Sequence, residues 1–583
     1  MNDRSLRFFQ TLLFILLTAT LNYAVAAPSS VAAFNQLADE YFDTVYLPAN
    51  PTEAAVLGVH LYDHQLEDYS AGGRKRLIAR LQQFAKRVEA IKPATLNMQT
   101  QGDRELVLNN IRSQLLTLQK IRPWQKDPDY YSSGITYAAF VIMERPFASV
   151  DDRLRSFITR EKLMPAVFEE ARKNLKNPPK IYTEIAIEQL PGLIEFFQKD
   201  VPLAFVKAND AELKKEFNET NAAVIAALQS YQAWLKTDLL PRSHGNFRIG
   251  ADTFSKKLKY DEMVDLPLSK LKKIGLANLR QNQLAYQKVL SELAKGGSLA
   301  DVEASNAADH PAPDQLLKAF SSSFDGLISF IKQHKIVTIP SDVRPLMEET
   351  PPFMRATTLA SMDTPGPFEK VAKEAYFNVT LPDASWGKAK VSDYMAVFNY
   401  PAIKGTAIHE TYPGHYVQFL WMHNVPGRVR KTLGASSNAE GWAHYCEQMM
   451  LDEGYGESAD KREALLLKLG QLQNALLRNA RFMVSIAMHT GKMTLDEAVE
   501  YFVKEGKQSR TTAMIETKRG TSDPTYLYYT LGKLQILKLR EDMEAKLGKK
   551  FSLQKFHDDF MRQGFPPIKI VRKALLQDDS PTL

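Results

Sequence analysis

Residues 213–235 read LKKEFNETNAAVIAALQSYQAWL, and apolar side chains recur in them three, four or seven positions apart. This stripe consists of Leu213, Phe217, Val224, Leu228, Tyr231 and Leu235. Such spacing places apolar side chains on one face of an α-helix. The pattern recurs over residues 108–118 and 465–476, and Thr494 with Glu497 has the spacing of a capping box that begins a helix. The sequence therefore predicts a mainly α fold.

The composition is that of a globular protein. The 583 residues are 44% hydrophobic and 24% charged, which is enough for one large core or several cores. The 74 Lys and Arg exceed the 67 Asp and Glu, which gives a formal net charge of +7. Because basic and acidic residues are interspersed, no basic stripe forms, and we do not expect a nucleic-acid partner.

The amino end has the order of a secretory signal peptide. Arg4 and Arg7 precede an apolar run that begins near Leu12 and ends in Ala24-Val25-Ala26. We predict that residues 1–26 are removed and that the protein is exported, to the periplasm or outside the cell. The alternative is an uncleaved membrane anchor. The apolar run is shorter than the roughly 20 residues that a membrane span needs, which argues against an anchor.

Nothing after the signal peptide indicates a membrane span in the mature chain. The only cysteine is Cys446, which is far from any position of lipid attachment and has no cysteine to pair with. We therefore expect no intramolecular disulfide, even in an oxidising compartment. Packing must supply the stability of the fold.

Turn-forming residues divide the chain. They cluster at Gly296-Gly297-Ser298 and across residues 307–314, and proline and glycine interrupt helices. We predict a helical N-terminal lobe at 27–345 and a second lobe at 346–583, with a few short strands. One such strand is predicted over Tyr376–Thr380, where an extended substrate is hypothesised to pair with it.

The second lobe contains the sequence AIHETYPGH at residues 407–415. Two imidazoles beside a carboxylate resemble the His-Glu-x-x-His zinc motif, in which the glutamate acts as general base. Here His409 and His415 are six positions apart, and at about 100° per residue they point to different sides of a regular helix. We expect Pro413-Gly414 to break the helix and to return His415 to the side of His409.

A third metal ligand is predicted in the sequence NAEGWAHYCE at residues 438–447. Glu440 would complete a three-ligand site that leaves one position for water. His444 is four residues later on the same helical face, where it would support the site or donate a proton to the substrate. The simpler alternatives are that Glu440 caps a helix and that His444 is a packed residue. The residues 346–583 thus form the predicted metal-site catalytic lobe.

These motifs resemble the bacterial family catalogued as domain of unknown function 885, which is grouped with the gluzincin-type metallopeptidases. The matching residues are His409-Glu410-Thr411, Pro413-Gly414-His415, Gln418, Glu440-Gly441-Trp442-Ala443, Glu516, Arg519, Pro524, Tyr529, Gly532, Leu539-Arg540, Leu547-Gly548, Phe551, Phe556-His557 and Gly564. The resemblance covers most of the mature chain and is sharpest after Asn399. It implies a large two-lobed helical fold with a central cleft, a Zn²⁺ cofactor and hydrolysis of peptide bonds.

The resemblance also assigns roles. With Zn²⁺ on His409, His415 and Glu440, the carboxylate of Glu410 would take a proton from the attacking water. A tyrosine would stabilise the oxyanion, and Tyr529 is the one that aligns with the family pattern.

Two nearby side chains are candidates for binding the substrate. If the segment around Tyr529 is helical, Tyr526 shares its face, while Tyr528 points elsewhere. Arg519 would bind a substrate carboxylate, which would give carboxypeptidase-like cleavage. The alternative for Arg519 is an ion pair with Glu516 or another acid.

The predicted function is hydrolysis of oligopeptides, with a peptide as the partner. One alternative is a metal-dependent hydrolase of a non-peptide amide or ester, because a metal site does not by itself select the acyl group. The other is a periplasmic binding protein without turnover. The presence of Glu410 argues against it, since loss of the general base is the simplest route to an inactive relative.

Overall fold

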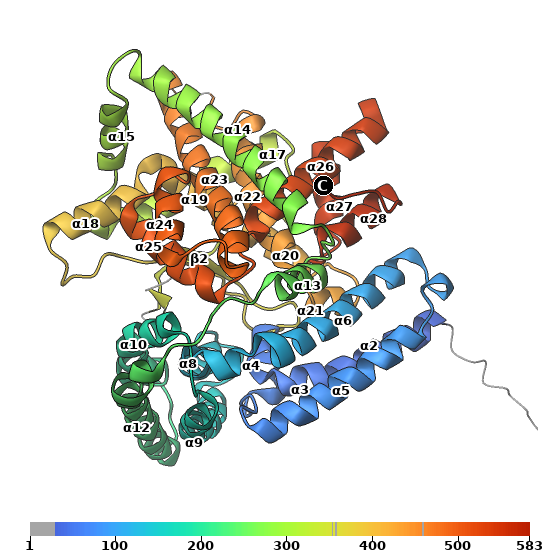
Figure 1. The fold of residues 1–583 in the computed structure, drawn as a ribbon, viewed down its shortest axis with the longest axis vertical. Coiled ribbons are helices and arrows are strands. Elements are labelled where there is room, and N and C mark those ends of the chain that lie inside the picture. The colour runs from blue at the N-terminus through green and yellow to red at the C-terminus, as the bar shows by residue number, and fades with distance from the viewer. Residues whose placement is uncertain (1–29, 352–353, 356–357, 458–459) are drawn as a thin grey trace, which may run out of the picture.

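The computed structural model describes residues 30–351, 354–355, 358–457 and 460–583 (Figure 1). Helices dominate, and the strands form one small sheet, so the predicted mainly α class is confirmed. The predicted signal peptide, residues 1–26, lies outside the described residues. In the described part of the chain, no helix is both long enough and apolar enough to cross a membrane.

Residues 30–242 form two helical groups, which lie in the lower part of Figure 1. The first group comprises α2 (Ser30–Tyr41), α3 (Leu47–Ala49), α4 (Pro51–Val56), α5 (Ala71–Ala90), α6 (Met98–Leu116) and α7 (Pro123–Lys126). The second comprises α8 (Asp129–Met143), α9 (Val150–Asn174), α10 (Lys180–Glu195), α11 (Val201–Ala204) and α12 (Ala211–Trp234). The apolar stripe of α12 is buried in the core of the second group, as its spacing predicts.

The remaining helices and strands form the upper part of Figure 1. They are α13 (Ala251–Asp261), α14 (Leu268–Ala294), α15 (Leu299–Ala308), α16 (Leu316–Ser321), α17 (Phe324–Gln333), β1 (Leu346–Glu349), β2 (Ala360–Asp363), β3 (Tyr376–Val379), α18 (Lys388–Met395), α19 (Tyr400–Glu410), α20 (His415–Met422), α21 (Arg428–Thr432), α22 (Ser436–Asp452), α23 (Lys461–His489), α24 (Leu495–Lys504), α25 (Arg510–Ser522), α26 (Tyr528–Leu547), α27 (Leu553–Met561) and α28 (Ile568–Leu576). Thr494 and Glu497 form the predicted capping box at the start of α24.

The packing does not divide the chain at residue 345, where the sequence placed a lobe boundary. Phe254 of α13 shares a core with Phe482 of α23, and Leu279 of α14 shares one with Leu476. Residues 316–337 belong to the largest core of the C-terminal half. The glycines and prolines of residues 296–314 therefore connect helices within one packed unit.

The sheet has the strand order β1-β3-β2. Strand β1 runs parallel to β3, with Leu346 beside Tyr376, and β2 runs antiparallel to it, with Asp363 beside Tyr376. The predicted strand exists as β3, but it is central and all four of its residues are buried. Since both edges of β3 are paired, the hypothesis that a substrate pairs with this strand is wrong.

Helices α22 and α26 meet at a contact that requires glycine. A Cβ atom on Gly532 would lie 1.8 Å from the carbonyl oxygen of Ser437, and one on Gly441 would lie 2.5 Å from the Cα of Gly532. The two backbones therefore touch without side chains between them. This contact brings Glu440 of α22 close to Tyr529 of α26, so it positions both predicted site residues.

We expect Gly532→Ala to lower the free energy of unfolding by about 2 kcal/mol or more, because the added methyl group must push the two helices apart. The matched control is Gly326→Ala in α17, where an added Cβ has no atom within 4 Å. Alanine should stabilise that exposed helical position by about 0.5–1 kcal/mol. Chemical denaturation measures the free energy of unfolding of both variants. If Gly532→Ala were as stable as Gly326→Ala, the close-contact interpretation would be contradicted.

Candidate metal centre

The two predicted histidine ligands lie on either side of a break between helices. Helix α19 ends at Glu410, and α20 begins at His415. The peptide bond between Tyr412 and Pro413 is cis, and a Cβ on Gly414 would lie 1.8 Å from the carbonyl oxygen of His409. The departure from helical geometry predicted at Pro413-Gly414 is therefore present, and glycine is required there for close approach of the backbone.

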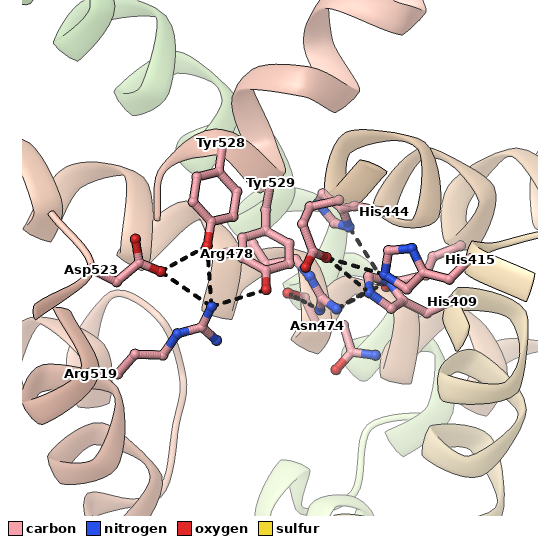
Figure 2. Close-up of polar contacts among 11 residues, drawn as sticks. His409, His415, His444, Asn474, Arg478, Arg519, Asp523, Tyr528 and Tyr529 are labelled. Atoms are coloured by element: carbon pink, nitrogen blue, oxygen red, sulfur yellow. Dashed lines mark hydrogen bonds and ion pairs between the residues drawn. The ribbon is translucent and has the colours of Figure 1, made fainter. Parts of the chain in front are cut away.

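The break turns both imidazoles toward one carboxylate. Nε2 of His409 lies 3.5 Å from Oε2 of Glu440, and Nε2 of His415 lies 3.4 Å from the same oxygen. All three candidate ligand atoms lie within 4.8 Å of one another, and the imidazole rings are nearly perpendicular at 86°. Figure 2 shows the two rings side by side.

This arrangement fits a tetrahedral zinc ion. With metal–ligand bonds of about 2.0–2.1 Å, neighbouring ligand atoms of a tetrahedron lie about 3.4 Å apart. The distances to Oε2 of Glu440 have this value. That oxygen is buried and makes no hydrogen bond within the described part of the chain. A buried carboxylate oxygen without a donor requires a partner, and a cation between the three residues would supply it.

The charge of Glu440 suits a ligand. Burial alone would raise the pKa of this carboxyl, but the imidazoles of His409 and His415 lower it well below its usual range. The carboxylate is therefore ionised at neutral pH, as metal coordination requires.

Glu447 orients His409, and the sequence analysis did not assign it a role. Nδ1 of His409 donates a hydrogen bond of 2.7 Å to Oε1 of Glu447, which leaves Nε2 free to face the cation site. Arg478 of α23 approaches the same oxygen at 3.1 Å and donates to the carbonyl oxygen of Asn474 (Figure 2). The spacing of seven between Glu440 and Glu447 places both on one helical face and could have indicated this pair. No pattern in the sequence indicates that Arg478 of α23 contacts Glu447.

His444 lies behind Glu447. Its Nδ1 is 3.6 Å from Oε1 of Glu447, and its side chain is 1% exposed. Burial is the main cause that lowers the pKa of His444 well below its usual range, so the ring is neutral. This position fits the packed alternative and not the predicted role as proton donor to a substrate.

Glu410 lies next to His409 at the end of α19. Its carboxylate makes no hydrogen bond with any residue that the structure describes. Burial raises its pKa, while the imidazoles of His409 and His415 oppose that shift. A carboxylate of raised pKa beside the two imidazoles has the properties of a general base.

Tyr529 lies between the imidazoles and Arg519, and Arg478 is on the side of the imidazoles (Figure 2). Arg519 donates a hydrogen bond of 3.2 Å to its phenolic oxygen, and the guanidinium of Arg481 lies 4.7 Å from its ring centre. Burial and the carboxylate of Glu440 raise the pKa of Tyr529. The phenol is therefore protonated at neutral pH and able to donate a hydrogen bond.

Tyr526 and Tyr528 do not lie where the sequence predicts: Tyr528, and not Tyr526, is beside Arg519. Tyr526 is completely buried in a core cluster, and its hydroxyl has no partner in the described residues, so it does not fit a role in substrate binding. The hydroxyl of Tyr528 donates to Asp523 at 2.8 Å, beside Arg519. The prediction assumed a helix through residue 526, but α26 begins only at Tyr528, so the side-chain directions differ.

Arg519 forms the alternative ion pair with another acid, Asp523, and not with Glu516. The carboxylate of Glu516 binds Arg481 through two short contacts of 2.6 and 2.7 Å. Arg519 instead has one ion pair of 3.4 Å with Asp523. Its side chain is 29% exposed, so it keeps access to solvent.

A family model described as "Bacterial protein of unknown function (DUF885)" matches residues 51–575. The chain belongs to the DUF885 family. The resemblance to this family is thus confirmed over nearly the whole described chain.

Two solved structures share the fold of this DUF885 protein. A "putative lipoprotein of unknown function" from Shewanella oneidensis has 25% sequence identity and a TM-score of 0.76, over 94% of this chain and 100% of that one. A "putative lipoprotein" from Colwellia psychrerythraea has 20% identity and a TM-score of 0.75, over 93% and 98%. No curated protein shows a significant match.

We expect His415→Ala and Glu440→Ala of the DUF885 protein to lose stoichiometric zinc, because two ligands cannot replace three. Glu447→Gln should bind zinc about 10- to 100-fold more weakly, since the imidazole of His409 loses its orienting carboxylate. Elemental analysis after dialysis and competition with a chelator measure these effects. The control is His423→Ala, an exposed histidine after α20 that should leave zinc binding unchanged. Full zinc content in both ligand variants would exclude the site.

Proposed function

We propose that this protein is an exported zinc peptidase that hydrolyses peptide bonds of oligopeptides. The observation that carries the proposal is the convergence of His409, His415 and Glu440 at the spacing of a tetrahedral site. The adjacent Glu410 and Tyr529 supply a base and a donor, which a purely structural zinc site does not need. The likeness of the motifs to gluzincin-type peptidases supports the choice of a peptide bond.

Zinc in this position would acidify a water molecule and polarise the scissile carbonyl. Glu410 accepts the proton of the attacking water and passes it to the departing amine. The phenol of Tyr529 donates a hydrogen bond to the oxygen that becomes negative. Glu447 and Arg478 keep the ring of His409 in one orientation throughout.

Export is part of the proposal. It rests on the amino-terminal sequence, with its Arg residues, apolar run and small residues before Ala27, and on the description of two structural relatives as putative lipoproteins. A peptidase in the periplasm or outside the cell would act on peptides that have left, or are entering, the cell.

Glu410→Gln tests the catalytic role. We expect this variant to keep its zinc and to lose about 10²- to 10⁴-fold in kcat/KM, because amide cannot accept the proton of water. Hydrolysis of a defined peptide mixture, followed by mass spectrometry, gives the rates, and elemental analysis gives the zinc content. A chelator should abolish activity and added zinc should restore it.

The control for this experiment is Glu216→Gln on α12, an exposed glutamate that pairs with Lys162 far from the site. Its rate should stay within about twofold of the parent protein. Undiminished hydrolysis by Glu410→Gln would refute the mechanism. Absence of any hydrolysis by the zinc-loaded parent, over peptides of varied sequence and length, would refute the peptidase assignment.

A further inference from the structure

Three arginines surround the ring of Tyr529, and they differ in how their charges are satisfied. The guanidinium carbons of Arg481, Arg478 and Arg519 lie 4.7, 5.6 and 5.7 Å from the ring centre. Arg481 is held by two short contacts with Glu516, and Arg478 by Glu447 and a backbone carbonyl. Both side chains are largely buried, and their charges are paired within the protein.

Arg519 is held more loosely. All of its polar contacts use Nη2, which lies 3.4 Å from Asp523, 3.4 Å from the hydroxyl of Tyr528 and 3.2 Å from that of Tyr529. Within the described residues, Nη1 and Nε have no partner. The same oxygen of Asp523 already accepts the hydrogen bond of Tyr528 at 2.8 Å. The hydrogens of Nη1 and Nε are thus left for a ligand.

The free N–H groups of Arg519 are close to the proposed reaction centre. Tyr529 contacts Arg519 through its hydroxyl, and the carboxylate of Glu440 is among the charges that raise the pKa of the same phenol. Figure 2 shows Tyr529 between Arg519 and the two imidazoles, with Arg478 on the side of the imidazoles. A group bound to Arg519 is therefore on the far side of Tyr529 from the candidate metal site.

A cavity adjoins two of the residues that contact Arg519. Asp523 and Tyr528 form part of the wall of this cavity of about 260 Å³, which is bounded on other sides by α6, by α13 and by the start of α22. Lys257 in this wall is engaged by Asp261 at 2.5 Å.

We infer that Arg519 binds the free C-terminal carboxylate of the substrate, so that the enzyme removes one or a few residues from that end of a peptide. A guanidinium whose Nη1 and Nε hydrogens are free, and whose one ion pair is 3.4 Å long, can form charge-assisted hydrogen bonds with a carboxylate. The terminal carboxylate on Arg519 would place the preceding peptide bond beside Tyr529 and Glu410. This inference rests on the proposed peptidase function and specifies its substrate class.

Peptides with blocked ends test the inference. We expect C-terminal amidation to lower kcat/KM by about 10- to 100-fold, the range for loss of a charge-assisted pair, and N-terminal acetylation to change it by less than about threefold. Arg519→Gln should reduce the rate for free-acid peptides to that for amides, mainly through KM. Arg519→Lys, which keeps the charge without the fork, should recover only part of the loss. The control Arg510→Gln, exposed at the start of the same helix, should behave as the parent.

A binding experiment separates this inference from the peptidase assignment. In the zinc-loaded Glu410→Gln protein, calorimetry should show tighter binding of a free-acid peptide than of its amide. Adding Arg519→Gln should remove that difference while leaving the melting temperature and zinc content unchanged. Equal cleavage and binding of acid and amide peptides, or inhibition by N-acetylation instead, would overturn the role of Arg519 and leave the peptidase intact. Lack of hydrolysis by the parent would instead refute the peptidase itself.

Discussion

The close contact between Gly441 and Gly532 is the constraint on which the centre of this protein depends. It brings the backbones of α22 and α26 together with no side chains between them. Glu440 immediately precedes one glycine, and Tyr529 is three residues before the other. The register of this single helix crossing therefore sets the distance between a candidate metal ligand and a candidate oxyanion donor.

Pairing of buried charges then determines which groups remain available. An ion buried without a partner is costly, and Glu447, Arg478, Glu516 and Arg481 each have one. Their pairing fixes the orientation of His409 and the surroundings of Tyr529. Among the described residues, one oxygen of Glu440 is buried without a hydrogen bond. A metal ion bound by His409, His415 and Glu440 would satisfy it.

The predicted boundary at residue 345 shows what local sequence patterns cannot predict, which is how distant helices pack together. Glycine and proline between residues 296 and 314 correctly mark interruptions of helices, but an interruption does not reveal which surface each neighbouring helix covers. Leu279 and Phe254 both precede the predicted boundary, but they pack against residues that follow it. Their partners, Leu476 and Phe482, lie about 200 residues away, and periodicity carries no information about such distant contacts.

The sequence by itself determined the mainly α class, the start of α24 and the three residues that converge at the candidate metal site. Apolar spacing, capping and the motifs of His409, His415 and Glu440 are local patterns. The sequence also located the helix break, since Pro413 and Gly414 cannot continue regular helix. Only the tertiary structure decided that Glu447 and Arg478 hold His409, that Tyr528 and not Tyr526 lies beside Arg519, and that Arg481 takes Glu516. These choices depend on how α22, α23, α25 and α26 cross, and helix crossings are set by packing between segments far apart in the chain.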